Sequence, residues 1–420
     1  MNQPDACSEK VRQLIKKGVD IPNPLSMDIG EEVNTAQISG SGVKIYPGCR
    51  IYGEKTVISA GALIGYEGPA TIDDCQIGPK VELKGGYFKK SVFLEKSSMG
   101  LGAQVREGCI LEEEANGAHC VGLKQTILFP FVTLGSLINF CDCFMAGGTS
   151  RKNHSEVGSS YIHFNFTPDG DKTTASLFGD VPKGVMLNQP PIFLGGQGGA
   201  VGPLRLGYGN VVAAGTILRK DILKDNCLVF GKFPRKDIEV EFVRNSYPGL
   251  SRIIENNVRY LANLTALEQW YINVRRAFFA DQEFGELIYS GLIDKLVSAR
   301  SERISRLRVI SEKMPQSLNA SANDDRIAAG KGEFYQNFHL LPELLDGKSV
   351  ASETEGYRDR FLASFSDHRA NSKSSYIETV QGMPEKASQL GTLWLEGIVD
   401  TICSQTARVF PSLDMFKRGK

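Results

Sequence analysis

Residues 211–229 read VVAAGTILRKDILKDNCLV in one-letter code. Branched aliphatic residues recur there at every sixth position: Val211, Ile217, Leu223 and Val229. The same interval separates four aliphatic residues nearer the N-terminus: Ile45, Ile51, Val57 and Leu63. An α-helix would show a period of 3.6 and a half-buried strand a period of 2. A period of six favours a solenoid with three short faces per coil, in which each of these aliphatic side chains points inward.

Glycine supports the same interpretation and divides the chain in two. Of the 44 glycines, 33 precede residue 232, and many directly follow an aliphatic residue, as in Ile64-Gly65 and Leu206-Gly207. Glycine suits tight corners because a positive φ costs it little. We therefore expect a left-handed parallel β-helix over about residues 29–238. An ordinary β-sandwich with coincidental spacing is the alternative.

The period of six fails over residues 139–156 and 165–202, where glycine, proline and aspartate supply turn chemistry. These two stretches are expected to leave the solenoid as loops, which is where a rigid scaffold usually carries its function.

After Pro248 the spacing of apolar residues changes to that of α-helices. Apolar residues at intervals of three and four predict helices over about 253–274, 283–313, 353–367 and 385–408, with Pro315 ending the second and a polar connector over 319–331. We therefore expect a mainly β plus α chain with three parts: a lead-in helix and linker (1–28), the β-helix (29–242) and an α-helical domain (243–420).

Composition excludes several classes of function. The 48 basic and 48 acidic side chains balance, which argues against electrostatic capture of nucleic acid or of an anionic membrane surface. No apolar stretch is long enough to span a bilayer, and the charged first 20 residues do not resemble a secretion signal. The nine cysteines show no disulfide spacing, so a cytoplasmic protein with mostly free thiols is expected.

Few residues carry an obvious chemical signal. His154 lies in a polar loop and is as well suited to catalysis as to structure, whereas the apolar surroundings of His163 favour a structural role. The Cys141-Asp142-Cys143 triplet is interpreted as a strand with two buried thiols, and no metal site is predicted. The glycine-rich residues 195–202 lack the Lys-Ser/Thr of a phosphate-binding P-loop.

About half of the chain, residues 14–221, resembles the acetyltransferase half of the bifunctional enzyme that makes UDP-N-acetylglucosamine. The resemblance begins at Leu14-Ile-Lys-Lys-Gly-Val19 and includes Val105-Arg-Glu-Gly108, which is similar to the family's Arg-Pro-Gly turn. Its best stretch is Val157-Gly-Ser-Ser-Tyr-Ile-His-Phe-Asn-Phe166, followed by 170–172 and 177–180. Val212-Ala-Ala-Gly-Thr216 matches the family's coil near the pantetheine arm of coenzyme A.

The resemblance implies a homotrimer that uses acetyl-CoA and binds an amino sugar phosphate between subunits. It also implies roles for individual residues. The residues expected to hold phosphate are Arg106, Lys124 and Lys172. The residues expected to face the sugar are Asn165 and Phe166, and Phe166 replaces the family's tyrosine. The residues expected to lie beside acetyl-CoA are Ala213, Ala214 and Gly215.

The catalytic histidine of the family is missing. Its Gly-His-Leu-Thr-Tyr stretch corresponds to residues 139–143, so Phe140 occupies the position of the base. Because acylation of an amine needs a proton acceptor, His154 or Asp142 would have to replace it. Uridyltransferase activity is not expected, since only about 28 residues precede the solenoid.

Three functions remain open at this stage. The first is an acyl-CoA-dependent acyltransferase, similar to glucosamine-1-phosphate N-acetyltransferase, that acts on a sugar phosphate or a nucleotide sugar. The second is a catalytically lapsed protein that binds a sugar nucleotide as a sensor or scaffold. The third is a structural trimer that displays helical arms.

Overall fold

The first half of the protein is a parallel β-solenoid, followed by a helical region, as the sequence predicts. The computed structural model describes residues 8–165, 171–231, 239, 243–319, 325–345, 351–370 and 374–416. Most coils contribute one short strand to each of three sheets, here called sheets 1, 2 and 3 in the order in which the chain visits them. The turn between sheets 1 and 2 is called corner 1–2, and the other two turns are corner 2–3 and corner 3–1.

The strands are short and pair in parallel. Sheet 1 contains β1 (Asp28–Ile29), β3 (Arg50–Tyr52), β6 (Ala70–Asp73), β9 (Gly86–Lys89), β12 (Ala103–Val105), β15 (Gly122–Lys124), β18 (Asn139–Cys141), β23 (Ile162–Asn165), β26 (Gly199–Gly202) and β29 (Ile217–Leu218). Sheet 2 contains β4 (Val57–Ile58), β7 (Gln76–Ile77), β10 (Val92–Phe93), β13 (Ile110–Leu111), β16 (Ile127–Leu128), β19 (Cys143–Met145), β24 (Ser176–Phe178) and β27 (Arg205–Leu206). Sheet 3 contains β2 (Lys44–Ile45), β5 (Leu63–Ile64), β8 (Glu82–Leu83), β11 (Ser98–Met99), β14 (Asn116–Gly117), β17 (Thr133–Leu134), β22 (Glu156–Val157), β25 (Phe193–Leu194), β28 (Val211–Val212) and β30 (Leu228–Val229).

Stacked apolar side chains fill the solenoid. In sheet 1 each inward residue pairs with its counterpart in the next coil, giving a row that is at most 1% exposed: Ile51, Ile72, Phe88, Val105, Leu123 and Phe140. Full burial of one such side chain stabilises the fold by about 1.5–3 kcal/mol. These rows therefore supply much of the stability of the solenoid.

Ile45, Ile51 and Val57 of the first aliphatic run are buried as expected, but in the second run the inward register differs by one residue from the expectation. Val211 and Ile217 are 42% and 43% exposed and point outward, whereas their neighbours Val212 and Leu218 are 0% and 4% exposed. Leu223 is also exposed. The prediction was wrong here because both members of a Val-Val or Ile-Leu doublet are aliphatic. A period of six finds the coil but cannot tell which member faces the core.

Small hydroxyl and thiol side chains stand where the chain enters sheet 2. They form a ladder along the inside of corner 1–2: Thr56, Cys75, Ser91, Cys109, Thr126, Cys143 and Ser176. Thr126 Oγ1 donates to the Phe140 carbonyl at 2.7 Å, and Ser91 Oγ donates to the Arg106 carbonyl at 2.9 Å. The ladder thus satisfies buried backbone acceptors of the turns.

Less of the chain leaves the solenoid than the sequence analysis predicts. Within 139–156, β18, β19 and β22 stay in the sheets, and only the hairpin of β20 (Gly148–Ser150) and β21 (Asn153–His154) departs, at corner 2–3. Within 165–202, β24, β25 and β26 stay, and α2 (Val181–Gly184) departs at the same corner. Residues 195–202 form a corner and a strand rather than a protruding loop.

The helices outside the solenoid are as follows: α1 (Glu9–Lys17), α3 (Leu250–Asn273), α4 (Gly285–Asn319), α5 (Asp325–Asn337), α6 (Leu341–Leu344), α7 (Ala351–Ala370), α8 (Tyr376–Gln381) and α9 (Glu385–Val409). Short 3₁₀ turns are η1 (Pro24–Ser26), η2 (Thr35–Gln37), η3 (Arg275–Phe278), η4 (Phe338–Leu340) and η6 (Pro411–Leu413).

Two expectations about the helices were wrong. Helix α4 continues through Pro315, and α5 begins at Asp325, inside the expected connector. Helices α4 and α5 pack together, with Met314 and Ser317 buried near the end of α4. Such packing offsets the roughly 3 kcal/mol that proline costs inside a helix.

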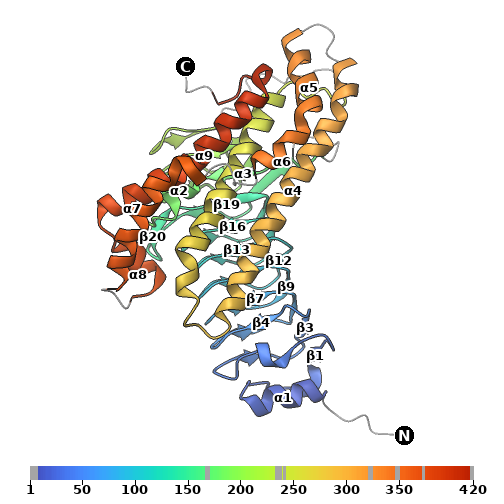
Figure 1. Ribbon diagram of the computed structural model, residues 1–420. Coiled ribbons are helices and arrows are strands. Elements are labelled where there is room, and N and C mark those ends of the chain that lie inside the picture. The colour runs from blue at the N-terminus through green and yellow to red at the C-terminus, as the bar shows by residue number, and fades with distance from the viewer. Residues whose placement is uncertain are drawn as a thin grey trace.

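Helices α3 and α4 run along the solenoid axis over sheet 2, and α1 lies at the opposite end of the molecule from α5 (Figure 1). Buried polar contacts hold α3 and the following turn η3 against the solenoid. The Arg275 guanidinium is 1% exposed, pairs with Glu113 at 2.8 Å and lies 3.7 Å from the ring centre of Tyr376. Tyr271 of α3 donates to Glu112, and burial raises the pKa of that carboxyl to about 7. The helical region is therefore docked through charged as well as apolar groups.

Candidate functional site at the solenoid corners

Two of the expected phosphate ligands stand one coil apart at corner 1–2. Val105 pairs with Leu123, so Arg106 and Lys124 occupy equivalent positions in successive coils. Lys124 Nζ lies 2.8 Å from Glu107 Oε1, and Arg106 Nε lies 3.9 Å from Glu107 Oε2. Both cations are partly exposed, so the structure brings two positive side chains to one open edge of the solenoid.

Asp142 follows at the same corner in the next coil, where it adopts a left-handed backbone conformation with φ of 57°. Its Oδ1 accepts a hydrogen bond from Arg303 Nη2 at 2.8 Å, and its Oδ2 accepts one from Thr174 Oγ1 at 2.8 Å. Arg303 belongs to α4, is 3% exposed, and also donates to the Lys172 carbonyl at 3.1 Å. The backbone of Lys172 is thereby held near Asp142, while its own side chain is exposed.

Phe140 and the neighbouring thiols are structural. The Phe140 ring is fully buried and lies 5.3 Å from the ring of Phe178. Cys143 is buried and Cys141 half-buried, so the expected pair of buried thiols is only partly found. Burial raises the pKa of Cys141 to about 11 and holds the pKa of Cys143 well above its usual value, which keeps both thiols protonated at neutral pH.

His154 lies on the β20–β21 hairpin at corner 2–3. Its Nδ1 is 2.9 Å from the Arg151 carbonyl oxygen, and the ring is half-buried. Since a carbonyl can only accept, Nδ1 carries the proton of this hydrogen bond. In the neutral ring the lone pair is then at Nε2, the arrangement that a general base requires.

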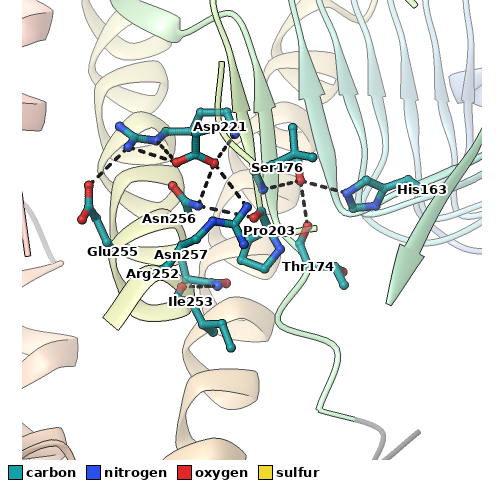
Figure 2. A network of polar contacts seen from close by, with 12 residues as sticks. His163, Thr174, Ser176, Pro203, Asp221, Arg252, Ile253, Glu255, Asn256 and Asn257 are labelled. Carbon is teal, nitrogen blue, oxygen red and sulfur yellow. Dashed lines mark hydrogen bonds and ion pairs between the residues drawn. The ribbon is translucent and has the colours of Figure 1, made fainter. Parts of the chain in front are cut away.

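His163 is a core residue, as the sequence analysis favours. Its ring is 7% exposed in β23, and Nε2 is 2.8 Å from Ser176 Oγ (Figure 2). Burial lowers the pKa of this imidazole to about 4. Asn165, at the end of the same strand, is exposed, and the expected sugar contact Phe166 lies outside the described residues.

Ser176 connects this histidine to the end of the solenoid that α3 covers (Figure 2). Its Oγ also accepts from the Leu204 backbone N–H at 3.0 Å. Close by, Asp221 binds Arg205 at 3.2 Å and Asn256 of α3 at 3.2 Å. The network fixes α3 against the last coils of the solenoid.

The expected acetyl-CoA contacts form corner 3–1 between β28 and β29. Ala214 and Gly215 are exposed, and a Cβ at Gly215 would have no heavy atom within 4 Å. The Gly215 N–H donates to the Gly196 carbonyl at 3.0 Å in the coil beside it. The corner is thus a small-residue surface open to solvent.

The candidate residues therefore fall on three edges. Corner 1–2 holds Arg106, Lys124 and Asp142; corner 2–3 holds His154; and corner 3–1 holds Ala213, Ala214 and Gly215. These three groups of residues lie at different corners of the solenoid, so they do not form one cluster within a single chain.

Sequence reasoning missed the part that α4 contributes. Its Ser298, Ser301, Glu302 and Arg306 line a groove of about 390 Å³ together with Glu107, Lys124 and Gln125. A helical stripe of apolar residues reveals that α4 packs, but not which corner its polar residues reach. The two parts of the groove are about 170 residues apart in the chain, and no local motif joins them.

The described residues contain neither a candidate membrane-spanning helix nor a candidate metal cluster. None of the helices there has a run of apolar residues sufficient to cross a bilayer. In the same part of the chain, no three His, Cys, Asp or Glu side chains are grouped so that they could ligate a metal ion.

Comparison with known proteins identifies homologues of the solenoid half. The chain is 27% identical over 214 residues to the bifunctional protein GlmU of Thermotoga maritima, which covers 51% of this chain and 42% of that protein. The proteins of the same name from Pelobacter propionicus and Kineococcus radiotolerans are 26% and 24% identical over 50% and 56% of this chain. The chain therefore spans less than half the length of these relatives. No protein-family model matches it.

Proposed function

We propose that this protein is a cytoplasmic acyltransferase that uses acetyl-CoA to acylate a sugar phosphate or a nucleotide sugar. The homology to bifunctional GlmU proteins over the solenoid half carries this proposal. The open edge with Arg106 and Lys124 supports it, because guanidinium and ammonium groups form charge-assisted hydrogen bonds with phosphate oxygens.

The transfer needs one proton acceptor. Acetyl-CoA supplies a thioester, and the acceptor amine or hydroxyl loses a proton as its new bond to the acyl carbon forms and the coenzyme A thiol leaves. Both carboxylate oxygens of Asp142 are engaged by Arg303 and Thr174, whereas Nε2 of His154 has its lone pair available. We therefore assign the general base to His154.

A homotrimer would bring the three edges together, because a corner of one subunit can face a different corner of its neighbour. The outer surface of sheet 3 supports self-association. Its outward row is polar over β8–β22 but ends in Phe193, Val211 and Leu228, which are 39%, 42% and 60% exposed and stack in register. Exposed apolar residues in a continuous row are typical of an interaction surface.

Calorimetric titration of the full chain tests the function. Acetyl-CoA is expected to bind in the micromolar range, as is either glucosamine 1-phosphate or UDP-N-acetylglucosamine. Release of the coenzyme A thiol should then depend on both substrates. A chain that binds the sugar ligand but has no affinity for acetyl-CoA would refute the acyltransferase and favour the sensor.

The variant His154→Ala separates binding from chemistry. It should lose turnover by a factor of about 10²–10⁴, the usual contribution of a general base, while it binds both ligands like the wild type. His339→Ala, at an exposed position in the helical region, is the matched control. Undiminished turnover in His154→Ala would contradict the assignment of the base.

Sedimentation tests the assembly. The chain is expected to sediment as a trimer of the 46.0-kDa subunit, and the double variant Phe193→Ser, Leu228→Ser should dissociate because it removes two members of the apolar row. The paired change Leu25→Ser, Tyr66→Ser removes exposed apolar residues of the first coils and serves as control. A monomeric wild type would contradict the intersubunit site.

A further inference from the structure

Helix α4 forms one wall of the groove at corner 1–2. The solenoid contributes Glu107, Lys124 and Gln125, and α4 contributes Ser298, Ser301, Glu302 and Arg306. The volume of about 390 Å³ is within the range of small-molecule sites, which is roughly 300–1,000 Å³. Both walls belong to the same chain, so this groove exists without a second subunit.

The two cations of the groove are each held by a single carboxylate. Lys124 Nζ lies 2.8 Å from Glu107, and Arg306 binds Glu302 through Nε at 2.8 Å and Nη2 at 2.7 Å. Among the described residues, Arg306 Nη1 has no hydrogen bond. All four side chains are about a quarter to two-fifths exposed, so water screens these pairs and leaves them weak. A doubly charged anion between Lys124 and Arg306 would compete well with the two carboxylates.

Gln125, which also lines the groove, carries a buried acceptor. Gln125 is 5% exposed, and its buried Oε1 has no hydrogen-bond partner in the part of the chain that the structure describes. Its backbone is held at a φ of 50°, and its N–H donates to the Glu107 carbonyl at 3.0 Å, which fixes the residue at the corner. A buried oxygen without a donor destabilises the site, so a ligand hydroxyl or N–H that reaches it would be favourable.

Ser298 and Ser301 of α4 also line the groove. The groove thus combines two cations, the two carboxylates of Glu107 and Glu302 that pair with them, an unpaired acceptor and two serines. Its walls match a compact ligand that carries both an anion and several hydroxyl groups.

We infer that the groove between corner 1–2 and α4 binds the phosphate of a sugar phosphate, with Arg306 of α4 completing the phosphate site that Lys124 begins. This inference rests on the proposed function for its choice of ligand. It adds that the helical region takes part in substrate recognition, and that the acceptor binds within one chain rather than between chains. Arg306 is then a specificity-determining residue outside the half of the chain that matches GlmU.

The test is calorimetric titration of the full chain with glucose 1-phosphate, inorganic phosphate and acetyl-CoA, each alone. Arg306→Ala is expected to weaken glucose 1-phosphate and inorganic phosphate at least tenfold, and Arg306→Lys to restore part of the affinity. Gln125→Met should weaken glucose 1-phosphate much more than inorganic phosphate, since the sugar hydroxyls are the donors expected to reach the Gln125 amide oxygen. The control is Arg308→Ala, an exposed arginine on the same helix that lies over Phe338 and away from the groove.

The outcomes separate this inference from the proposed function. Glucose 1-phosphate that binds wild type and Arg306→Ala equally would overturn the inference, as would a wild type that binds neither phosphate ligand. If acetyl-CoA fails to bind but the phosphate ligands depend on Arg306, the inference stands and the acyltransferase is refuted. Circular dichroism of each variant should match the wild type, because a misfolded Arg306→Lys would show a loss of signal that the binding data alone could not reveal.

Discussion

Replacement of His163 by glutamine tests how the solenoid tolerates a titratable group in its core. The imidazole lies inside β23, and its polar contact at Nε2 is with Ser176 Oγ. Glutamine also has a hydrogen-bonding end group but does not titrate. The variant therefore removes the pH dependence of this site and retains a polar partner for the serine.

The magnitude follows from the pKa. Burial lowers the pKa of His163 to about 4 from an ordinary value of 6.5. The folded state thus disfavours the protonated ring, so the stability this group contributes is complete above pH 6.5 and is lost as the pH falls towards 4. Each unit of pKa difference is worth about 1.4 kcal/mol, which gives a loss of ~2–3 kcal/mol between about pH 7.5 and 4.5.

Urea unfolding followed by far-ultraviolet circular dichroism measures this loss. We expect the wild type to lose ~2–3 kcal/mol more than His163→Gln between those two pH values, because only the wild type has an imidazole that protonates on unfolding. The same substitution at the exposed His339 serves as control and should follow the wild type. If the free energy of unfolding changes equally with pH in the wild type and in His163→Gln, the folded state accepts a protonated ring at pH 4.5. That result would refute the reasoning from burial.

Three further predictions concern stability. Burial raises the folded-state pKa of the Glu112 carboxyl to about 7, so the wild type should lose stability as the pH rises from about 4.5 to 7. Glu112→Gln should lose less stability over this range because its side chain does not titrate. The midpoints of urea unfolding at the two pH values measure the difference. Arg275→Met leaves Glu113 without its partner and should destabilise the docking of the helices by about 3–5 kcal/mol, seen as an earlier transition in tryptophan fluorescence. Gly53→Ala would place a Cβ 2.4 Å from the Asp74 nitrogen at a φ of 90°, and should cost about 2 kcal/mol or more in the urea transition by circular dichroism.

The coil was predictable because its period repeats along the sequence, but its corners were not. Glycine was expected at positions of positive φ, yet Asp74, Lys90, Gln125 and Asp142 adopt that conformation at corner 1–2. Asparagine, aspartate and other residues with polar side chains can accept this conformation when the stacked coils impose it. Glycine content therefore locates some corners of the solenoid but overlooks corner 1–2, where candidate residues lie.

The candidate site was predictable only where it is local. Arg106 and Lys124 belong to the repeat, and their equivalence follows from the register of β12 and β15. The contact between Asp142 and Arg303 joins residues 161 positions apart, and the direction in which a docked helix presents its polar side chains depends on packing that no sequence period encodes.

The positions of the two proposed ligand sites at different corners limit how the acyl group can reach its acceptor. Residues of α4 line a groove with Lys124 at corner 1–2, so both walls of the proposed phosphate site belong to one chain. Corner 3–1, with Ala214 and Gly215, remains open and lies at the end of the solenoid where the exposed apolar row of sheet 3 is found. If acetyl-CoA binds at that corner, as the resemblance implies, only a neighbouring subunit can bring the acyl group to the acceptor. A dissociated subunit would then retain its affinity for sugar phosphate and lose transfer, which distinguishes this arrangement from one in which both ligands bind between subunits.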